Sequence, residues 1–332
     1  MTDPSELSRA RRFRAGDTSP GPIIIIGGAE DKLRDRVILT RFVRLAGGPD
    51  AHIVVISTAS SLGDEATALY RELFTQLGAG EVSGLRPLTR DEADDPQAAA
   101  LVDQATGLFL TGGNQLRLSS VVGGTKLGAA LVRANQRGAV IAGTSAGASA
   151  VSTHMVAFGA SGPTPKQRMV QMAAGLGVLE NVVVDQHFEQ RTRLGRLLAV
   201  VAQSPSLLGM GLDEDTAAIV WPDRTMEVIG RGAVTIVDGS EVQTDAFQAR
   251  GHRPMMVSGA ILHSLPAGYR FDLTTRTLLA PVERTAPKRA AAETESARRR
   301  IQRLAKRIAA EGADSFVVER RRRAKEDKEA SE

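Results

Sequence analysis

The middle of the chain reads AVIAGTSAGA over residues 139–148. Residues 139–142 are small and apolar and predict a short buried strand, after which Gly143, Ser145 and Gly147 form the pattern G-x-S-x-G. A serine at a strand-to-helix turn exposes its Oγ, and flanking glycines leave room for backbone and substrate to approach. The helix N-terminus that follows favours a developing negative charge. The stretch predicts either a nucleophilic Ser145 or a tightly packed turn of small residues.

Short apolar runs recur on both sides of this stretch. Strands are predicted at 23–26, 52–58, 107–110, 182–184 and 207–212, and helices at 66–77, 129–137 and 189–203. This alternation predicts an α/β fold with a mostly parallel sheet and helices on both faces. Residues 217–279 show shorter alternating segments, which predict β-hairpins near the C-terminal end of the core.

Polar residues cluster directly after the predicted strands, at 27–32, 111–115, 143–147, 185–187 and 213–215. Ligands of such sheets bind beyond the carboxyl ends of the strands. We therefore expect these five strand ends to face one crevice.

Composition narrows the class of protein. The chain has 332 residues, of which 42% are hydrophobic, so it has the material for a large core. It has no cysteine, which excludes disulfides, a thiolate nucleophile and cysteine-ligated metal sites. Residues 1–20 are polar and carry arginines, which predicts a disordered segment without a secretory signal. With no apolar run long enough to span a bilayer, we expect a cytoplasmic protein without a membrane partner.

The positive charge is concentrated in the C-terminal segment. Residues 283–332 hold 15 basic and 10 acidic residues, whereas the rest of the chain holds 27 and 28. The body therefore lacks the basic signature of a nucleic-acid-binding protein. We expect a catalytic α/β domain at 21–282 and a charged, partly helical or disordered extension at 283–332. Its residues 295–311 have an apolar side and a basic side, so docking to a partner or a polyanion is the alternative to a solvated tail.

A serine nucleophile needs a base and a group that orients the base. Of five histidines, His187 alone directly follows an apolar run and precedes a predicted helix. His154 is expected a turn or more along the helix after Ser145. Glu214 follows the run 207–212, and its carboxylate would fix the imidazole tautomer. The order serine, histidine, acid differs from the order serine, acid, histidine of α/β-hydrolases. A helix cap is the alternative role for His187.

An oxyanion needs two N–H donors. Ala146, directly after the serine, is one candidate, and Gly113 in the turn TGGNQ of residues 111–115 is the other. A glycine lets the backbone approach closely and adopt a positive φ. A plain tight turn is the alternative for this segment.

Polar residues around His187 suggest a binding site: Asp185, Gln186, Arg191, Arg193 and Arg196. The three arginines are expected on the first turns of a helix, where its dipole disfavours cations. This placement indicates a site for a ligand carboxylate, because guanidinium groups pair with carboxylates through two hydrogen bonds. The aspartate and glutamine would add an acceptor for a cation and an amide. Solvated surface arginines are the alternative.

Together these residues resemble those of the cyanophycinases, in the serine peptidase family that also holds aspartyl dipeptidases. The matching stretches are GGAED at 27–31, TGGNQ at 111–115, GTSAGA at 143–148, DQHF at 185–188 with the three arginines, and GLDEDT at 211–216. The resemblance covers residues 23 to about 265. The spacing from Ser145 to His187 and from His187 to Glu214 is also similar to the family's.

The resemblance implies a class I glutamine-amidotransferase-like (flavodoxin-like) fold. It implies hydrolysis of cyanophycin, a poly-aspartate with an arginine on each β-carboxyl, to β-Asp-Arg dipeptides through an acyl-enzyme. Ser145 would be the nucleophile, His187 the base and Glu214 its orienting acid. Gln115 joins the five polar residues around His187 as a substrate-binding position. No metal or other cofactor is implied. Partners would be cyanophycin or aspartyl-arginine peptides, and a homodimer is an expectation from the family.

Two other functions remain open at this point. One is a related peptidase that acts on aspartyl or isoaspartyl dipeptides and leaves the polymer intact. The other is a non-catalytic binding protein on the same fold, with the basic segment at 283–332 as its working part.

Overall fold

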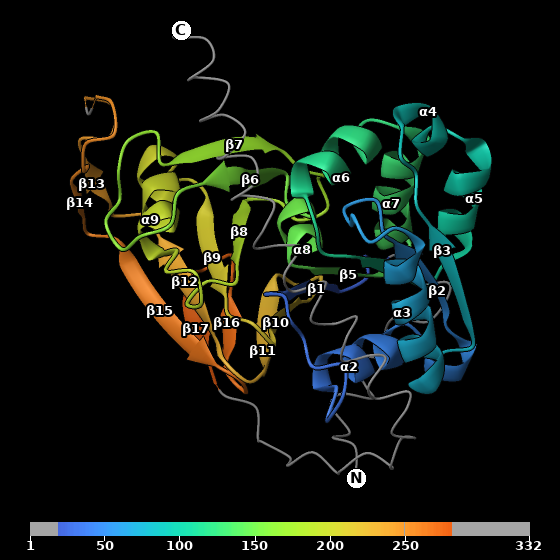
Figure 1. Cartoon of the computed structure of the whole chain (residues 1–332). Coiled ribbons are helices and arrows are strands. Elements are labelled where there is room, and N and C mark those ends of the chain that lie inside the picture. The colour runs from blue at the N-terminus through green and yellow to red at the C-terminus, as the bar shows by residue number, and fades with distance from the viewer. Residues whose placement is uncertain (1–18, 249, 281–332) are drawn as a thin grey trace, which may run out of the picture.

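The computed structural model describes residues 19–248 and 250–280 (Figure 1). Except for residues 19 and 20, the predicted disordered N-terminal segment lies outside the described residues, as does the whole predicted extension at 283–332. Nearly all of the described residues fall within the predicted catalytic domain, 21–282, whose bounds stay a prediction.

A nine-stranded sheet forms the centre of the described fold, in the order β17-β16-β11-β10-β1-β5-β4-β2-β3. Its parallel half runs from β1 to β3, and each neighbouring pair there is parallel. The strands of this half are β1 (Ile23–Ile26), β2 (His52–Ile56), β3 (Glu81–Leu85), β4 (Gly107–Leu110) and β5 (Val140–Thr144). Four of them match the predicted runs, and β3 was not predicted.

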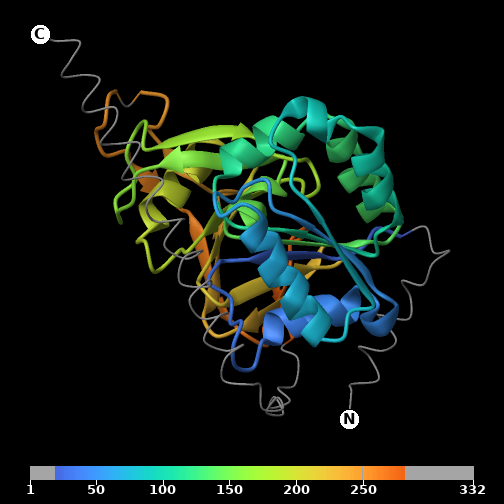
Figure 2. The ribbon, with the colours of Figure 1, turned by 45° about the vertical axis from the view of Figure 1, so that its right-hand side comes forward.

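Helices cover both faces of this half (Figures 1 and 2). One face carries α2 (Val37–Leu45) and α3 (Asp64–Gln76), and the 3-10 turn η1 (Gly48–Asp50) follows α2. The other carries α5 (Pro96–Gln104), α6 (Gln115–Val122), α7 (Lys126–Gln136) and α8 (Ala146–Ala150), with the short α4 (Arg90–Ala93) beside them.

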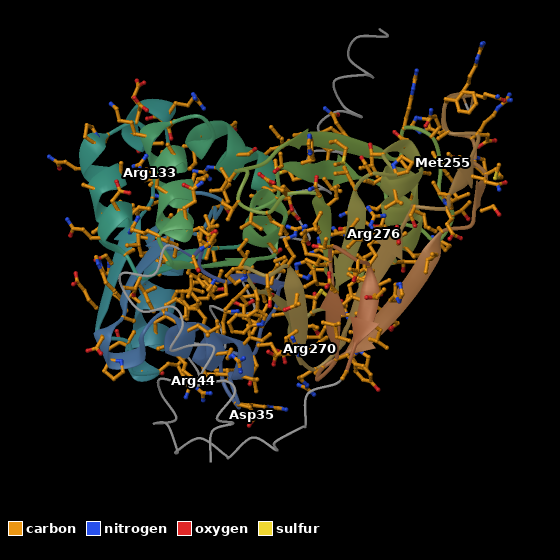
Figure 3. All side chains as sticks on the ribbon, turned by 180° about the vertical axis from the view of Figure 1, so that it is seen from behind. Asp35, Arg44, Arg133, Met255, Arg270 and Arg276 are labelled. Carbon is orange, nitrogen blue, oxygen red and sulfur yellow. The ribbon has the colours of Figure 1, made fainter. Side chains whose placement is uncertain are left out.

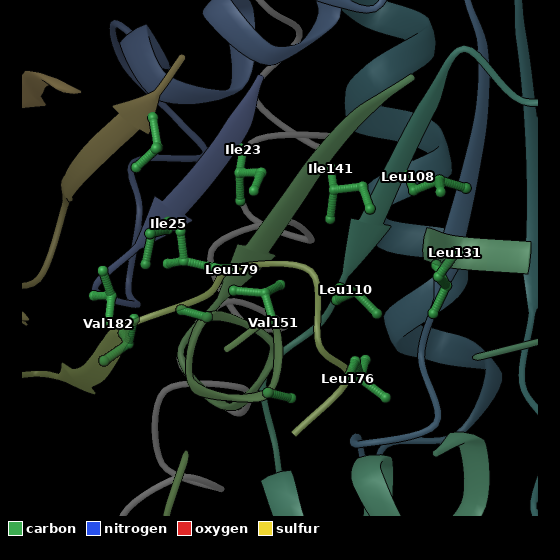
Figure 4. Packing of buried hydrophobic residues seen from close by; sticks show 14 of the residues in the cluster. Ile23, Ile25, Leu108, Leu110, Leu131, Ile141, Val151, Leu176, Leu179 and Val182 are labelled. Carbon is green, nitrogen blue, oxygen red and sulfur yellow. The ribbon is translucent and has the colours of Figure 1, made fainter. Parts of the chain in front are cut away.

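The run of isoleucines in β1 shows how the strand serves both faces. Ile24 and Ile26 pack with the helices α2 and α3, and Ile23 and Ile25 pack into the cluster on the opposite face. Side chains of a strand alternate between its two faces, so a strand buried on both sides needs apolar residues throughout. Figure 4 shows Ile23 and Ile25 projecting on the same side as Ile141 of β5.

The other half of the sheet is antiparallel. It consists of β10 (Thr216–Val220), β11 (Thr225–Gly230), β16 (Arg270–Asp272) and β17 (Thr277–Leu279). Strands joined by short turns, such as β10 with β11, pair antiparallel because a parallel pair needs a longer crossover. The predicted α/β fold is confirmed, with a mixed central sheet.

Two strands expected in this sheet form a second one instead. The order of the second sheet is β15-β12-β9-β8, made of β8 (Val182–Gln186), β9 (Leu208–Leu212), β12 (Ala233–Asp238) and β15 (Ile261–Pro266). Only β8 and β9 are parallel in it, and α9 (Leu194–Gln203) connects them. The expectation that all five polar strand ends belong to a single sheet is therefore wrong.

Backbone hydrogen bonds nevertheless join the two sheets at the end of β1. The carbonyl of Gly27 accepts from the N–H of His187 at 2.9 Å, and the carbonyl of Gly28 accepts from the N–H of Asp215 at 2.9 Å. The strand ends of both sheets consequently lie beside one another at this point.

The helix after Ser145 is shorter than expected. It ends at Ala150, and His154 begins the strand β6 (His154–Gly159), which pairs antiparallel with β7 (Val170–Ala174). A longer helix would need the Ala150 carbonyl for the N–H of His154, but that carbonyl accepts from Leu176 at 2.7 Å. The placement of His154 on a helix is wrong for this reason.

A smaller pair, β13 (Gln243–Thr244) and β14 (Val257–Ser258), lies at one end of the molecule. Seen from behind in Figure 3, Met255 beside this pair and Arg133 of α7 mark opposite sides of the structure. Among the described residues, none of the helices has both the length and the apolar character that crossing a membrane requires.

Candidate active site

Ser145 occupies the turn between β5 and α8. Its backbone has φ 51° and ψ −109°, an unfavourable conformation for a residue with a Cβ. Such strain costs about 1–3 kcal/mol and persists only where surrounding contacts impose it. The two glycines of the motif permit this geometry: a Cβ on Gly143 would lie 2.5 Å from the Gly147 backbone, and one on Gly147 would lie 2.3 Å from the Leu110 carbonyl oxygen. The predicted strand–turn–helix context of the serine is therefore present.

His187 follows β8 and meets the serine. Its Nε2 lies 2.8 Å from Ser145 Oγ, and its side chain is 4% exposed. The residue has φ 48°, so the chain leaves the strand direction at this point. Gly28, with φ 99°, lies against the imidazole, and a Cβ there would be 2.4 Å from His187 Cε1. Only a glycine at position 28 leaves room for the ring.

Glu214 supplies the carboxylate on the other side of the ring. Its Oε1 lies 2.6 Å from His187 Nδ1. Its two neighbours are engaged elsewhere, because Asp213 accepts from the N–H groups of Glu189 and Ala233 and Asp215 accepts from the N–H of Asp31. The three side chains predicted to meet, from β5, β8 and β9, are thus within hydrogen-bond distance, while their catalytic roles stay predictions.

The pKa shifts of His187 and Glu214 suit a neutral imidazole that can accept a proton. Burial lowers the pKa of His187, the hydrogen bond to Glu214 opposes that shift, and the charge of Arg191 adds to it. The hydrogen bond from His187 lowers the pKa of Glu214, against the effect of burial. At neutral pH the imidazole is therefore neutral and the carboxylate charged. With Nδ1–H donated to Glu214, Nε2 accepts from the serine hydroxyl.

The predicted oxyanion turn lies against the serine. A Cβ on Gly112 would be 3.4 Å from Ser145 Cβ and 3.9 Å from its Oγ. Gly113 has φ 135°, and a Cβ on it would lie 2.1 Å from the Ala59 carbonyl oxygen. Ala146 is the first residue of α8. The position suits an oxyanion hole, but contact with Ala59 alone already requires a glycine at 113, so the role of Gly113 and Ala146 stays a prediction.

Asp185 and two of the arginines form a buried ion cluster. Arg193 Nη1 lies 3.1 Å from Asp185 Oδ1, and Arg196 Nε lies 2.5 Å from Oδ2. Arg193 Nη1 also donates to Gln186 Oε1 at 2.8 Å. The side chains of Asp185, Arg193 and Arg196 are 1%, 8% and 4% exposed.

These contacts determine the protonation of the cluster. Burial alone would raise the pKa of Asp185, but the charges of Arg196 and Arg193 outweigh it and lower the pKa. Burial lowers the pKa of Arg193 to about 9, although the charge of Asp185 opposes this shift. The cluster carries one buried carboxylate between two guanidinium groups.

The structure corrects the expected arrangement of this site. Arg191 and Arg193 precede α9 instead of lying on its first turns, and Arg193 and Arg196 turn inward instead of lining an opening. Asp185 is covered by these two arginines, so its carboxylate does not face a ligand cation as predicted. The physical reason is that a buried carboxylate requires its own countercharge. A role of these residues and of Gln186 in substrate binding stays a prediction.

Arg191 differs from the other two arginines. It is only partly buried and interacts electrostatically with Glu214. Burial lowers its pKa, and the carboxylate of Glu214 opposes that shift. Of the three predicted arginines, it is the one beside the Ser145–His187–Glu214 line.

Gln115 begins α6, directly after the Gly112–Gly113 turn. Its Nε2 donates to the carbonyl oxygens of Val156 at 3.1 Å and Ala157 at 2.7 Å. The side chain thus ties the turn to β6. This anchoring occupies the amide nitrogen, and substrate binding by Gln115 stays a prediction.

A cavity of about 540 Å³ adjoins residues 191–196, called the arginine segment below because they include the three predicted arginines. Its lining includes Gly159, Lys166, Arg168 and His252. Gly159 belongs to the wall nearest the ion cluster, because its carbonyl accepts from Arg196 Nη1 at 3.2 Å. The lysine and arginine are exposed, which makes this a basic hollow.

Two residues beside the line had no role assigned from the sequence. Gly28 lies against His187, and Glu30 binds the hydroxyl of Thr144 at 2.6 Å. The only signal was their place in GGAED, directly after a strand end. A metal site would need at least three histidine, aspartate or glutamate side chains close together. Residues 19–248 and 250–280 contain no such group.

Comparison with known proteins finds related peptidases. The family model described as peptidase family S51 matches residues 23–229. A cyanophycinase of Trichormus variabilis is 40% identical over 286 residues, which are 85% of this chain and 96% of that protein. A cyanophycinase of Synechococcus elongatus is 41% identical over 257 residues, 77% of this chain and 80% of that protein. The crystal structure of a peptidase from an acI-B1 Actinobacterium shares the fold, with a TM-score of 0.55 and 24% identity over 75% of this chain and 98% of that one.

Proposed function

The chain belongs to peptidase family S51, and from this premise we propose that it is a serine exopeptidase that degrades cyanophycin to β-Asp-Arg dipeptides. The observation that carries the proposal is the line of two short contacts, 2.8 Å from Ser145 Oγ to His187 Nε2 and 2.6 Å from His187 Nδ1 to Glu214 Oε1. About 40% identity to cyanophycinases over most of the chain favours cyanophycin over other amide substrates.

The chemistry proceeds in two steps. Ser145 Oγ attacks the carbonyl carbon of a backbone amide between successive aspartates while His187 Nε2 takes its proton. The imidazolium, stabilised by Glu214, then gives that proton to the leaving nitrogen as the C–N bond breaks. Water, deprotonated by His187, attacks the acyl-enzyme, and the acid product leaves as the proton returns to Ser145.

Two N–H groups would stabilise the oxyanion of both tetrahedral intermediates. Ala146 heads α8, and Gly113 lies in the turn that packs on Ser145, so both donors come from rigid backbone near the hydroxyl. Donors that are already oriented stabilise developing charge without reorganisation.

Substrate charge suggests where the rest of the polymer lies. Each unit of cyanophycin offers an arginine α-carboxylate and a guanidinium group. Arg191 beside Glu214, and Lys166 and Arg168 at the basic hollow, are cations on the described surface near the arginine segment. We assign them to substrate carboxylates, while the buried Asp185, Arg193 and Arg196 cluster shapes the wall behind them.

Four further features belong to this proposal. The five parallel strands with helices on both faces support the class I glutamine-amidotransferase-like arrangement, and the antiparallel pair β16–β17 supports the expected hairpins. A cytoplasmic, homodimeric enzyme is proposed from the family resemblance alone. Sedimentation of the full chain measures the dimer directly.

The test uses purified full-length protein and insoluble cyanophycin. Wild-type protein is expected to release β-Asp-Arg, identified by mass spectrometry, and Ser145→Ala protein is expected to release none. Cleavage of aspartyl or isoaspartyl dipeptides with the polymer untouched would replace this function by that of a dipeptidase. Folded wild-type protein that hydrolyses neither, yet binds a polyanion through residues 283–332, would support the non-catalytic alternative.

A further inference from the structure

The loop between β1 and α2 contacts His187 and the residues next to Ser145 and Glu214; Ser145, His187 and Glu214 are called the reactive line below. Its residues 27–31 read GGAED. The Gly27 carbonyl accepts from the N–H of His187, and the Gly28 carbonyl accepts from the N–H of Asp215, next to Glu214, both at 2.9 Å. Because His187 and Glu214 follow strands of the second sheet and Ser145 follows a strand of the first, this loop lies where the strand ends of the two sheets meet.

Glu30 connects the same loop to the serine. Its side chain is fully buried, and Oε2 accepts from the Thr144 hydroxyl at 2.6 Å. Oε1 accepts from the Tyr70 hydroxyl at 2.6 Å and lies 2.8 Å from Lys32 Nζ. Thr144 directly precedes Ser145. One carboxylate oxygen of Glu30 is therefore hydrogen-bonded to the residue just before the strained backbone of Ser145.

The charge state of Glu30 favours a fixed hydrogen bond to Thr144. Burial would raise its pKa, but the charge and hydrogen bond of Lys32, together with the hydrogen bonds from Thr144 and Tyr70, lower it. A buried charge with its countercharge and donors in place is rigid, because each partner is lost only at a large cost. The chemistry of the proposed function does not otherwise use this ion pair.

The serine turn needs such support. Ser145 has a left-handed φ of 51°, and its N–H donates to the Ile26 carbonyl at 3.0 Å. That bond fixes the backbone of Ser145 to β1, and the bond from Thr144 to Glu30 fixes the preceding side chain to the same loop. Strained conformations persist where surrounding contacts over-determine them.

We propose that Glu30 is a positioning residue that, through the Thr144 hydroxyl, holds Ser145 Oγ in line with His187. The proposal rests on the proposed function only in taking Ser145 as the nucleophile. The side-chain partners of the Glu30 carboxylate are Thr144, Tyr70 and Lys32, and its effect is on the placement of the hydroxyl. Misplacing a reacting group by about 1 Å can cost on the order of 10²-fold in rate.

The informative substitution is at Thr144. Glu30→Gln would leave the buried Lys32 without its countercharge and risks misfolding. Thr144→Val removes only the hydroxyl and keeps the side-chain volume, and Thr144→Ser restores a donor. Thr67→Val is the matched control, because it removes another buried hydroxyl, bonded to Ser57 Oγ at 2.7 Å, on α3 away from the serine turn.

Two readouts separate positioning from general stability. The first is the second-order rate at which a fluorophosphonate labels Ser145, which requires no knowledge of the substrate. The second is kcat and KM on cyanophycin. Thr144→Val is expected to lower the labelling rate and kcat about 10- to 100-fold with KM unchanged. Thr144→Ser and Thr67→Val are expected to stay within about threefold of wild type.

The proposal is overturned if Thr144→Val labels at the wild-type rate. It is also overturned if Thr67→Val loses as much labelling as Thr144→Val at equal melting temperature. Wild-type protein that is labelled at Ser145 but leaves cyanophycin intact would end the substrate assignment alone, and the labelling series would still decide the role of Glu30.

Discussion

Two polar groups lie side by side at the end of β8, and they differ in what satisfies their charges. In the ion cluster, Asp185 has both oxygens bonded by Arg193 and Arg196, and all three side chains are at most 8% exposed. In the reactive line, His187 is buried, but Glu214 at its far end is 38% exposed. The first group is closed on itself, whereas the second is partly exposed at both of its ends, Ser145 and Glu214.

The comparison shows that closeness in sequence to a reactive residue does not decide a polar residue's task. Asp185 and His187 are two positions apart and would share a face if β8 continued. The left-handed φ of His187 instead ends the strand, so the imidazole turns toward Ser145 while Asp185 stays with Arg196 of α9. The Asp185 carboxylate, neutralised by two arginines, serves the fold. The neutral imidazole of His187, beside a hydroxyl, can accept a proton and pass it on.

Ser145→Ala tests the reactive line most directly and has the largest expected effect. We expect turnover of cyanophycin to fall by about 10³-fold or more, because losing a nucleophile removes the covalent route. Thermal unfolding should change little, since the alanine keeps the Cβ and loses one hydroxyl. Ser149→Ala, which removes a hydroxyl from the short helix α8 that follows Ser145, is the control and should keep its turnover. If Ser145→Ala protein were as active as wild type, the reactive line would not differ in task from the ion cluster.

Asp185→Asn should affect stability more than chemistry. It leaves two buried guanidinium groups without their carboxylate, and such a loss typically costs about 3–5 kcal/mol of unfolding free energy. Urea denaturation measures the change. Asp103→Asn is the control, because its carboxylate pairs with Arg133 at 2.8 Å on the surface, where about 1 kcal/mol or less is expected. A well-folded, equally stable Asp185→Asn protein would show that Arg193 and Arg196 do not depend on this carboxylate for their burial.

The pH profile of kcat/KM should report His187. Because burial lowers its pKa from the ordinary value of 6.5, activity should hold through neutral pH and fall only on acidification below that value. The carboxylate of Glu214 raises the pKa of the imidazole, so Glu214→Gln should move the acidic limb to still lower pH as well as reduce the rate. A limb that moves upward in Glu214→Gln would contradict the orientation proposed for this pair.

The basic hollow should have the smallest effect. Replacing Lys166 and Arg168 together by glutamate is expected to raise KM for cyanophycin a few-fold at low salt, with kcat unchanged, and added salt should reduce the difference. The same charge change at Lys126 and Arg133 of α7, both about half exposed, is the control. An unchanged KM would restrict substrate contacts to the neighbourhood of Arg191.

Much of the fold was predictable because its strands are buried on both sides. The runs at 23–26, 107–110 and 182–184 are almost wholly apolar, and this pattern needs no knowledge of neighbours. The strand at Glu81–Leu85 was missed since it is only partly buried at the sheet edge and carries polar residues. The pair β6–β7 was missed because its start depends on bonds between Ala150, Val151 and residues 176–179 far along the chain.

The candidate site also has a part that the sequence predicted and a part that it did not. Local sequence determined that Ser145 lies at a strand-to-helix turn and that His187 and Glu214 follow strands, because small residues and apolar runs act over a few positions. The tertiary structure alone decided that these strand ends come from two sheets joined at Gly27 and Gly28, that Asp185 keeps Arg193 and Arg196 for itself, and that Glu30 reaches Thr144. The contacts from Ser145 to His187, from His187 to Glu214 and from Glu30 to Thr144 join positions 27 to 114 apart, and no local pattern contains those distances.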